Sequence, residues 1–296
     1  MTLSFIILNY NTSLQTLNCV KSIIDHAPNT SYEIIVVDNN SNKEEWETLN
    51  SLLQDYDLNI IKSRINLGFG AGNVLGANFA NGDFLCFLNS DIIFTEDCIT
   101  TLIEYLNRHN DVGCITPQQY NRNNIIVPSF NHDLGITEEL FGKELLETLF
   151  SSKYPKRKNT IYKKPFSVKQ INGCFMIFPK NIFWEVGGFD QNIFLYYEEL
   201  DICYRLKEKG YKSVVYPNCR FSHLHGESTK KAHSNTVREL YISKMYCYRK
   251  YHNIILSSCF RIINIIKLMT KPNKWYILPV VLRGESSSKS MRHNRL

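Results

Sequence analysis

A short apolar run that ends on an acid, residues 84–92 (FLCFLNSDI), constrains the fold of this chain more than any other stretch. Five apolar residues in succession suit a central strand of a parallel sheet, which is covered on both faces. In open sheets built from alternating strands and helices, ligands bind outside the carboxyl ends of the strands. Asp91 is therefore expected at a ligand-binding edge, although an isolated acid after a strand can equally cap the next helix.

Short apolar strands and amphipathic helices alternate on both sides of this run. Such alternation predicts an α/β fold with a mostly parallel sheet flanked by helices. Three predicted strands end in the polar residues Asn9, Asp38 and Asp91, which we expect to converge on one crevice. The other strands are predicted over 3–8, 33–37, 58–61 and 112–116, with helices starting near Ser13, Ser41 or Asn42, Gly68 and Glu96.

A run of glycines, Gly68, Gly70, Gly72 and Gly76, precedes the central strand. Its spacing is one residue too long for the G-x-G-x-x-G pattern of dinucleotide-binding proteins. It also follows the third predicted strand, whereas that pattern follows the first. The favoured interpretation is that these glycines allow close backbone approach at the start of a helix.

The second half of the chain is less regular. A single helix is predicted over 137–149 with four residues facing inward, namely Leu140, Phe141, Leu145 and Leu149, and residues 153–164 form a basic loop. Residues 181–186 are expected to form a short helix and 213–216 a strand.

Three acids, Glu198, Glu199 and Asp201, stand at a predicted helix start after the aromatic stretch 194–197. Acids at this position can simply complement the helix dipole. Apolar surroundings and neighbouring carboxylates also raise a carboxyl pKa, which suits a general base. His223 and His225 are two residues apart at a predicted strand end, where they are either metal ligands or structural side chains.

Composition limits the classes of function. The formal charge of +6 is too small to indicate a nucleic-acid partner, and none is predicted. The nine cysteines include no C-x-x-C pair, which argues against a zinc site and for a reducing compartment. No secretory signal and no membrane-spanning run are expected, so the predicted location is cytoplasmic.

Taken together, the motifs resemble those of the inverting family 2 glycosyltransferases with the GT-A fold, especially the bacterial rhamnosyltransferase-like branch. The resemblance covers about residues 3 to 250. Its motifs occur in the family's order: 7–11 (ILNYN), 36–41 (VVDNNS), 66–70 (NLGFG), 88–91 (LNSD), 172–173 (NG), 187–190 (GGFD), 197–201 (YEELD), and His223 with Gly226 and Ser228.

The resemblance implies roles for individual residues. Glu199 would be the catalytic base, and Asp91 with His223 would hold Mg²⁺ or Mn²⁺ on the diphosphate of a nucleotide sugar. Tyr10 and Asp38 would hold the nucleobase. Asn9, Asn66, Gly68 and Asn89 would also lie at the nucleotide sugar, and Gly188, Phe189, Asp190, Glu198 and Asp201 would lie on the acceptor side.

Two positions depart from the family pattern. Glu199 stands where the family usually has Asp, and Asn89-Ser90-Asp91 stands for Asp-X-Asp, which leaves a single carboxylate for the metal. The implied activity is sugar transfer from a nucleotide-diphosphate sugar to a hydroxyl of a glycan or lipid-linked acceptor in bacterial surface-polysaccharide synthesis. The alternatives are a nucleotidyltransferase and a non-catalytic nucleotide-sugar-binding protein.

The expected organisation is a glycosyltransferase domain over 1–250, with a nucleotide-sugar half over 1–116 and an acceptor half over 117–250, and a helical extension over 251–296. In that extension, residues 254–270 form an apolar helix with one polar stripe, Ser257, Ser258, Arg261, Asn264 and Lys267. Such a helix could lie on the inner membrane as a peripheral anchor, or pack on the domain or on a second copy. Residues 284–296 are expected to be disordered.

Overall fold

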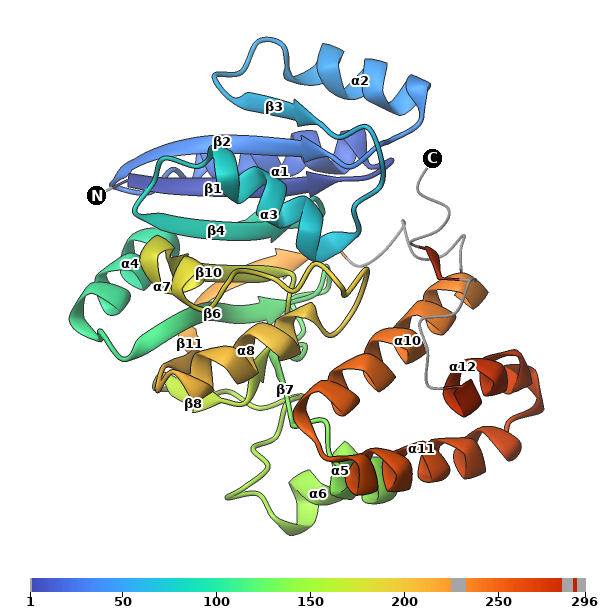
Figure 1. Cartoon of the computed structure of the whole chain (residues 1–296). Coiled ribbons are helices and arrows are strands. Elements are labelled where there is room, and N and C mark those ends of the chain that lie inside the picture. Colours follow the sequence, from blue (N-terminus) through green and yellow to red (C-terminus); the bar gives the residue numbers. More distant parts are fainter. Residues whose placement is uncertain (1, 225–232, 284–289, 292–296) are drawn as a thin grey trace.

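The computed structural model describes residues 2–224, 233–283 and 290–291 of the chain (Figure 1). A twisted central sheet carries helices on both faces, and a group of C-terminal helices lies beside it. None of the described helices combines the length and apolar character needed to span a bilayer.

The first half of the sheet consists of parallel strands in the order β3-β2-β1-β4. They are β1 (Thr2–Asn9), β2 (Ser31–Asp38), β3 (Asn59–Lys62) and β4 (Phe84–Asn89). β1 pairs in parallel with β2 on one side and with β4 on the other. The chain therefore changes direction across the sheet at β1, and such a switch point opens a crevice at the carboxyl ends of the two strands.

The second half of the sheet mixes strand directions. β10 (Phe175–Pro179) runs antiparallel between β4 and β6 (Val112–Tyr120), and β6 pairs in parallel with β11 (Lys212–His223). β5 (Ile92–Phe94) and β8 (Phe166–Val168) each pair with β11 in the antiparallel direction. The predicted α/β class and its mostly parallel sheet are confirmed. A separate antiparallel pair joins β7 (Phe130–Asn131) to β9 (Gln170–Ile171).

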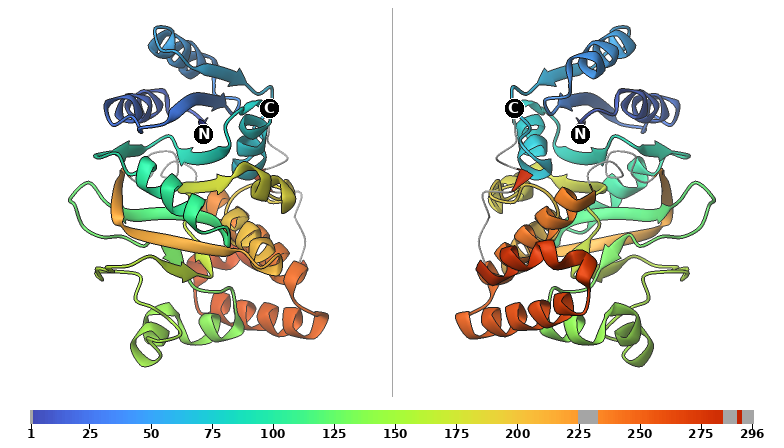
Figure 2. Two further views of the ribbon diagram at one scale, coloured as in Figure 1. Left: turned by 90° about the vertical axis from the view of Figure 1, so that its left-hand side faces the viewer. Right: turned by 90° about the vertical axis from the view of Figure 1, so that its right-hand side faces the viewer.

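The helices form one layer on each face of the sheet (Figures 1 and 2). Side chains alternate along a strand, so Phe5 and Ile7 of β1 face one layer and Ile6 faces the other. The first layer contains α1 (Ser13–Asp25), α2 (Lys43–Leu53) and α4 (Ile99–Arg108), and the second contains α3 (Phe69–Phe79), α7 (Lys180–Glu185) and α8 (Glu198–Glu208). Each large apolar side chain buried in these two cores contributes about 1.5–3 kcal/mol.

The glycines at the start of α3 lie against other parts of the backbone and core, as the sequence predicted. A Cβ atom on Gly76 would lie 2.6 Å from Ile6, and one on Gly72 would lie 2.6 Å from Leu8. Gly68 has a φ of +83°, and a Cβ there would lie 2.2 Å from the carbonyl oxygen of Phe194. Only glycine therefore lets α3 approach the sheet and the 194–197 segment this closely.

The single helix predicted over 137–149 is wrong, because the chain breaks at Gly142 into α5 (Ile136–Phe141) and α6 (Lys143–Leu149). Gly142 has a φ of +76°, which a continuous α-helix does not accommodate. The four side chains predicted to face inward are exposed instead, namely Leu140, Phe141, Leu145 and Leu149. Leu146 is the buried leucine of α6.

The C-terminal helices are α10 (His233–Tyr251), α11 (Ile254–Met269) and α12 (Leu278–Arg283), with the 3₁₀ helix η1 (Pro272–Ile277) between the last two. Phe260 of α11 stacks on Tyr248 of α10 with 3.8 Å between the ring centroids. Within the polar stripe predicted on α11, Asn264 is buried and accepts a hydrogen bond from Lys244. The predicted disordered segment 284–296 lies almost wholly outside the described residues.

We expect Gly68→Ala to lower the free energy of unfolding by about 2–5 kcal/mol. The positive φ is unfavourable for alanine, and the added methyl group would clash with the Phe194 carbonyl oxygen. Gly142→Ala is the matched control: its φ is also positive, but a Cβ there meets no described atom within 4 Å. Its cost should be only about 1–2 kcal/mol. Urea unfolding of both variants measures the difference, and equal losses would contradict this account of Gly68.

Candidate active site

A cavity of about 530 Å³ lies at the carboxyl ends of β1 and β4, at the switch point of the sheet. This volume is in the range of small-molecule sites. Its lining brings together most of the residues that the sequence singled out: Tyr10, Asn66, Gly68, Asn89, Asp91, Glu198, Glu199 and His223. Asp91 and Glu199, which come from separate parts of the chain, therefore line one cavity.

One wall of the cavity is ordered by Asn39, which the sequence analysis did not select as a site residue. Its side-chain amide donates to Asn66 Oδ1 (3.0 Å) and to the Gly68 carbonyl (3.1 Å), and its oxygen accepts from the Leu67 amide (2.8 Å). These bonds fix the turn before α3. Backbone amides and glycines in such a turn suit close approach to a phosphate or sugar.

Asn9 and Asp38 lie beneath this wall and do not line the cavity. Their strands are in register, and Asn9 Nδ2 donates to Asp38 Oδ1 at 2.8 Å. Asp38 Oδ2 accepts from the Ser41 amide at 3.2 Å, and the Asp38 residue is fully buried. Of the two residues predicted to hold the nucleobase, Tyr10 thus reaches the cavity, whereas Asp38 holds the strand ends together.

Asp91 and His223 are brought together by the pairing of β5 with β11, in which His223 lies opposite Ile92. His223 Nε2 lies 2.9 Å from Asp91 Oδ1, and His223 Nδ1 lies 3.0 Å from Gln119 Nε2. Burial alone would lower the pKa of His223, but the neighbouring Cys174 and the Asp91 carboxylate outweigh it and raise the pKa to about 10. His225, the other predicted histidine, lies outside the described residues.

The oxygen donors beside Asp91 fit a hard divalent cation. Asn89 Oδ1 is buried and has no hydrogen-bond partner in the described part of the chain, and it lines the cavity next to Asp91. No group of three His, Cys, Asp or Glu side chains with metal-binding geometry occurs among the described residues. Mg²⁺ or Mn²⁺ bound here would therefore draw most of its ligands from substrate phosphates and water, as Mg²⁺ commonly does.

Glu198 and Glu199 project from the first turn of α8. The chain enters this helix through Tyr196 and Tyr197, whose φ angles are +67° and +72°. Two successive non-glycine residues in the left-handed region are costly, and such strain is common where a site fixes its side chains. The entry turn thus sets the direction in which both acids point.

The two acids differ in their contacts. Glu199 Oε1 accepts a 3.0 Å hydrogen bond from Gln170 Nε2, whereas Glu198 Oε2 is buried with no partner in the described residues. Burial, followed by the charge of Glu199, raises the pKa of Glu198 well above its usual range. Burial also raises the pKa of Glu199, while Gln170 and the Lys143 cation oppose the rise. The protonated form is thus favoured more strongly at Glu198 than at Glu199, and Glu199 is the better candidate for a base.

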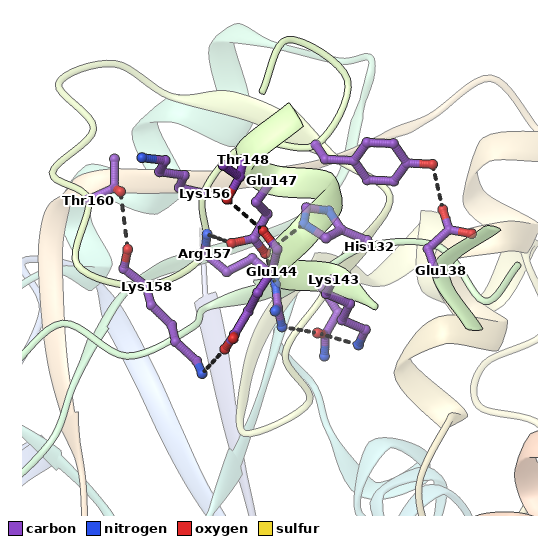
Figure 3. A network of polar contacts seen from close by, with 12 residues as sticks. His132, Glu138, Lys143, Glu144, Glu147, Thr148, Lys156, Arg157, Lys158 and Thr160 are labelled. Atoms are coloured by element: carbon purple, nitrogen blue, oxygen red, sulfur yellow. Dashed lines mark hydrogen bonds and ion pairs between the residues drawn. The ribbon is translucent and has the colours of Figure 1, made fainter. Parts of the chain in front are cut away.

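Behind Gln170 lies a polar network that sequence analysis did not anticipate. Asn131 of β7 lies opposite Gln170 of β9, and Asn131 Oδ1 accepts from Lys143 Nζ (2.9 Å) and Arg157 Nη1 (3.0 Å). Arg157 in turn pairs with Glu147, which also contacts the His132 ring at 2.9 Å (Figure 3). This network holds β9, and therefore Gln170, in a fixed position against the acid.

The residues predicted on the acceptor side divide into two groups. Glu198 lines the cavity, whereas Gly188, Phe189, Asp190 and Asp201 do not. Phe189 packs edge-on against Phe87 (5.1 Å between centroids) in the core. Asp190 and Asp201 both accept from Lys250 Nζ of α10, and Asp201 also pairs with Arg205. Asp201 thus joins α8 to α10, and Asp190 joins the segment before α8 to α10.

Arg122 also lines the cavity and was missed by the sequence analysis. It is the single Lys or Arg among the cavity residues in the described part of the chain, so it is the side chain best suited to meet a second phosphate. It follows β6 in an irregular segment, where no periodicity or motif marks one basic residue above its neighbours.

Comparison with known proteins identifies the family. A sequence profile described as "Glycosyl transferase family 2" matches residues 4–187, which is more than half of the chain. The chain therefore belongs to glycosyl transferase family 2.

Individual relatives agree with this assignment. The chain is 28% identical over 212 residues to the low-salt glycan biosynthesis hexosyltransferase Agl10 of Haloferax volcanii, covering 70% of this chain and 62% of that protein. It is 26% identical over 215 residues to the rhamnosyltransferase WbbL of Escherichia coli, covering 67% and 75% respectively.

The fold is shared with solved glycosyltransferases. GalNAc-T7, solved with UDP, GalNAc and Mn²⁺, superposes with a TM-score of 0.61 at 19% identity, over 88% of this chain and 54% of that one. The predicted GT-A fold is thereby confirmed. This chain spans less than two thirds of the length of GalNAc-T7 and of Agl10.

We expect Gln170→Met to raise the pKa of Glu199 further, because the methionine cannot donate the hydrogen bond that stabilises the carboxylate. The acidic limb of the profile of kcat/KM against pH should move upward by about half to one pH unit, since the base is active only when deprotonated. Gln54→Met, on the exposed end of α2, is the control and should leave the profile in place. An unmoved limb in Gln170→Met would contradict the role of this bond.

Proposed function

We propose that the protein is an inverting glycosyltransferase that moves a sugar from a nucleotide-diphosphate sugar to a hydroxyl of a glycan or lipid-linked acceptor. One observation carries this proposal: a phosphate-side group, Asp91 with His223, and a half-buried carboxylate of raised pKa, Glu199, line the same cavity. Membership of the family and the motifs of the sequence support it. The predicted division of the chain at residues 116 and 250 remains a prediction.

The reaction needs one displacement. The Glu199 carboxylate takes the proton of the acceptor hydroxyl, and that oxygen attacks the anomeric carbon of the donor sugar. The new carbon–oxygen bond forms as the bond to the diphosphate breaks, and the nucleoside diphosphate leaves with the electron pair. Attack from the face opposite the leaving group inverts the anomeric centre, with no covalent enzyme intermediate.

The leaving diphosphate requires positive charge. Asp91, assisted by Asn89 and His223, would hold Mg²⁺ or Mn²⁺, which supplies charge neutralisation at the diphosphate when bound. GalNAc-T7 is described with Mn²⁺, which supports the same class of cofactor here. Arg122 adds a cationic side chain of the protein itself to the lining of the cavity.

The rival functions have less support. A nucleotidyltransferase would normally carry a glycine-rich, basic phosphate loop after its first strand, whereas residues 9–12 here are Asn-Tyr-Asn-Thr. A non-catalytic binding protein would not need a half-buried acid held by Gln170 at the cavity. We further propose that the protein works in the cytoplasm on surface-polysaccharide precursors; its nine free thiols, eight of them buried, are compatible with a reducing compartment.

Glu199→Gln should abolish transfer while leaving donor binding within about twofold of the wild type, since the amide keeps the shape but cannot accept the proton. A panel of nucleotide sugars, assayed first for hydrolysis and then for transfer, identifies the donor for this test. Glu104→Gln, on the exposed face of α4, is the control and should keep full activity. Transfer by purified Glu199→Gln at the wild-type rate would remove Glu199 from the role of base.

Asp91→Ala should weaken donor binding, and a chelator should suppress turnover by the wild type, because the diphosphate would lose its counter-charge. Calorimetric titration with the nucleoside diphosphate, with and without Mn²⁺, reports binding independently of turnover. Asp97→Ala, in the exposed turn before α4, should bind as the wild type does. Full activity in the chelator, or Mn²⁺-independent binding, would contradict the metal assignment.

A further inference from the structure

We propose that the end of the molecule formed by α5, α6, α11 and η1 docks onto an anionic lipid bilayer. The exposed large apolar side chains gather there: of the twenty in the described residues, fourteen fall within 140–161 and 254–282. Figures 1 and 2 show α5, α6 and α11 together at the lower end of the molecule. We call this region, with its exposed apolar side chains within 140–161 and 254–282, the apolar end.

On α11 the exposed residues form a stripe. Ile255, Cys259, Ile262, Ile266 and Met269 are exposed and spaced four, three, four and three residues apart, which places them on one face of a helix. The opposite face packs on the protein through Phe260, Asn264 and Leu268. The helix is thus anchored by one face and leaves a second apolar face uncovered.

The second part of the apolar end comes from a distant stretch of sequence. Five large apolar side chains are exposed on α5, on α6 and just after α6, namely Leu140, Phe141, Leu145, Leu149 and Phe150. Lys267 of α11 pairs with Glu139 of α5 at 2.9 Å, so the two parts lie side by side. One helix with an exposed apolar face is weak evidence for a binding surface, but two neighbouring elements that both expose apolar side chains form an extended surface.

The charged residues around the apolar end indicate what kind of surface it binds. Between Glu147 and Glu185, and again between Glu239 and Glu285, the sequence contains no Asp or Glu. The first stretch carries exposed Lys153 and Lys156 shortly after α6, and the second carries exposed Lys271 directly after α11. Lysines beside an apolar face suit a bilayer with negatively charged headgroups.

The acids of α5 and α6 do not oppose this surface, because each is partnered within the protein. Glu138 accepts from Tyr154, Glu139 pairs with Lys244 and Lys267, Glu144 pairs with Lys158, and Glu147 pairs with Arg157. Trp275 of η1 is 53% exposed next to Lys274. Tryptophan is enriched at the boundary between headgroups and acyl chains.

The first test measures sedimentation with vesicles of phosphatidylcholine alone and of phosphatidylcholine and phosphatidylglycerol in equal parts. The wild type should bind the anionic vesicles more tightly. The double variants Ile262→Gln/Ile266→Gln and Leu149→Gln/Phe150→Gln should each bind at least about tenfold more weakly, since apolar area no longer enters the lipid. Phe79→Gln/Trp184→Gln removes two exposed apolar side chains from α3 and α7 and should bind as the wild type does.

Charge is tested separately. Lys271→Gln/Lys274→Gln should weaken binding to the anionic vesicles by about fivefold for each lysine and leave binding to neutral vesicles unchanged. Removal of α11 by truncation is a poorer test, because it would strip Phe260 and Leu268 from the core that they share with α10.

Cys259 allows a second, spectroscopic test. It is the exposed cysteine of the nine and lies within the α11 stripe. A polarity-sensitive fluorophore attached there should shift to shorter emission wavelength and gain intensity on addition of anionic vesicles. The control combines Cys259→Ser with Lys43→Cys on α2, where the side chain is 86% exposed, and its emission should not change.

Three outcomes would overturn the proposal. They are no binding of the wild type to either vesicle, full binding by both apolar double variants, or a wild-type dimer that these variants convert to monomers without any vesicle binding. The last result would assign the surface to a second copy of the chain. Donor hydrolysis should be unchanged in all of these variants, so loss of the proposed transferase activity and loss of docking are measured independently.

Discussion

The parallel pairing of β1 with β2 on one side and β4 on the other is the constraint on which the site depends. It sets Asn9 opposite Asp38 and Leu8 opposite Asn89. The three strands therefore end together, and Asp91 follows at the same edge. β4 lies in the interior because its residues 84–88 are all apolar, and all five are buried. Burial of apolar side chains thus places an acid at a crevice.

The opposite wall depends on contacts between segments that are distant in sequence. Glu199 is presented by a strained turn, held by Gln170 of β9, and carried on a helix that Asp201 joins to Lys250 of α10. Asp201 is a buried charge, and removing one partner of such an ion pair costs about 3–5 kcal/mol. The proposed base is therefore positioned by the middle and the C-terminal parts of the chain together.

Much of the fold could be predicted from the sequence because its signals are local. Runs of apolar residues marked the strands, glycine spacing marked the close approach of α3, and the order of the motifs marked Asp91, Glu199 and His223. The site contacts of Asn39, Gln170 and Arg122 could not be predicted in this way. Their roles arise from long-range pairing, such as Asn131 opposite Gln170, and no local pattern encodes which strands will meet.

The errors have equally specific causes. Periodicity continued through residue 142, but a single glycine with positive φ ended the helix there and turned Leu140 and Phe141 outward. On α11 one member of the predicted polar stripe, Asn264, is buried, because it accepts a hydrogen bond from Lys244. A polar side chain can thus be buried, against the helical periodicity, when the protein interior offers it a hydrogen-bond partner.

The central claim is that a single displacement takes place in one cavity. One wall of this cavity binds the phosphates of the donor, and the other carries Glu199, the proposed general base. The most direct measurement is the anomeric configuration of the product, determined by NMR immediately after transfer from a donor of known configuration. The account predicts inversion, because the acceptor oxygen deprotonated by Glu199 attacks opposite the leaving diphosphate. A product that retains the configuration of the donor would contradict it.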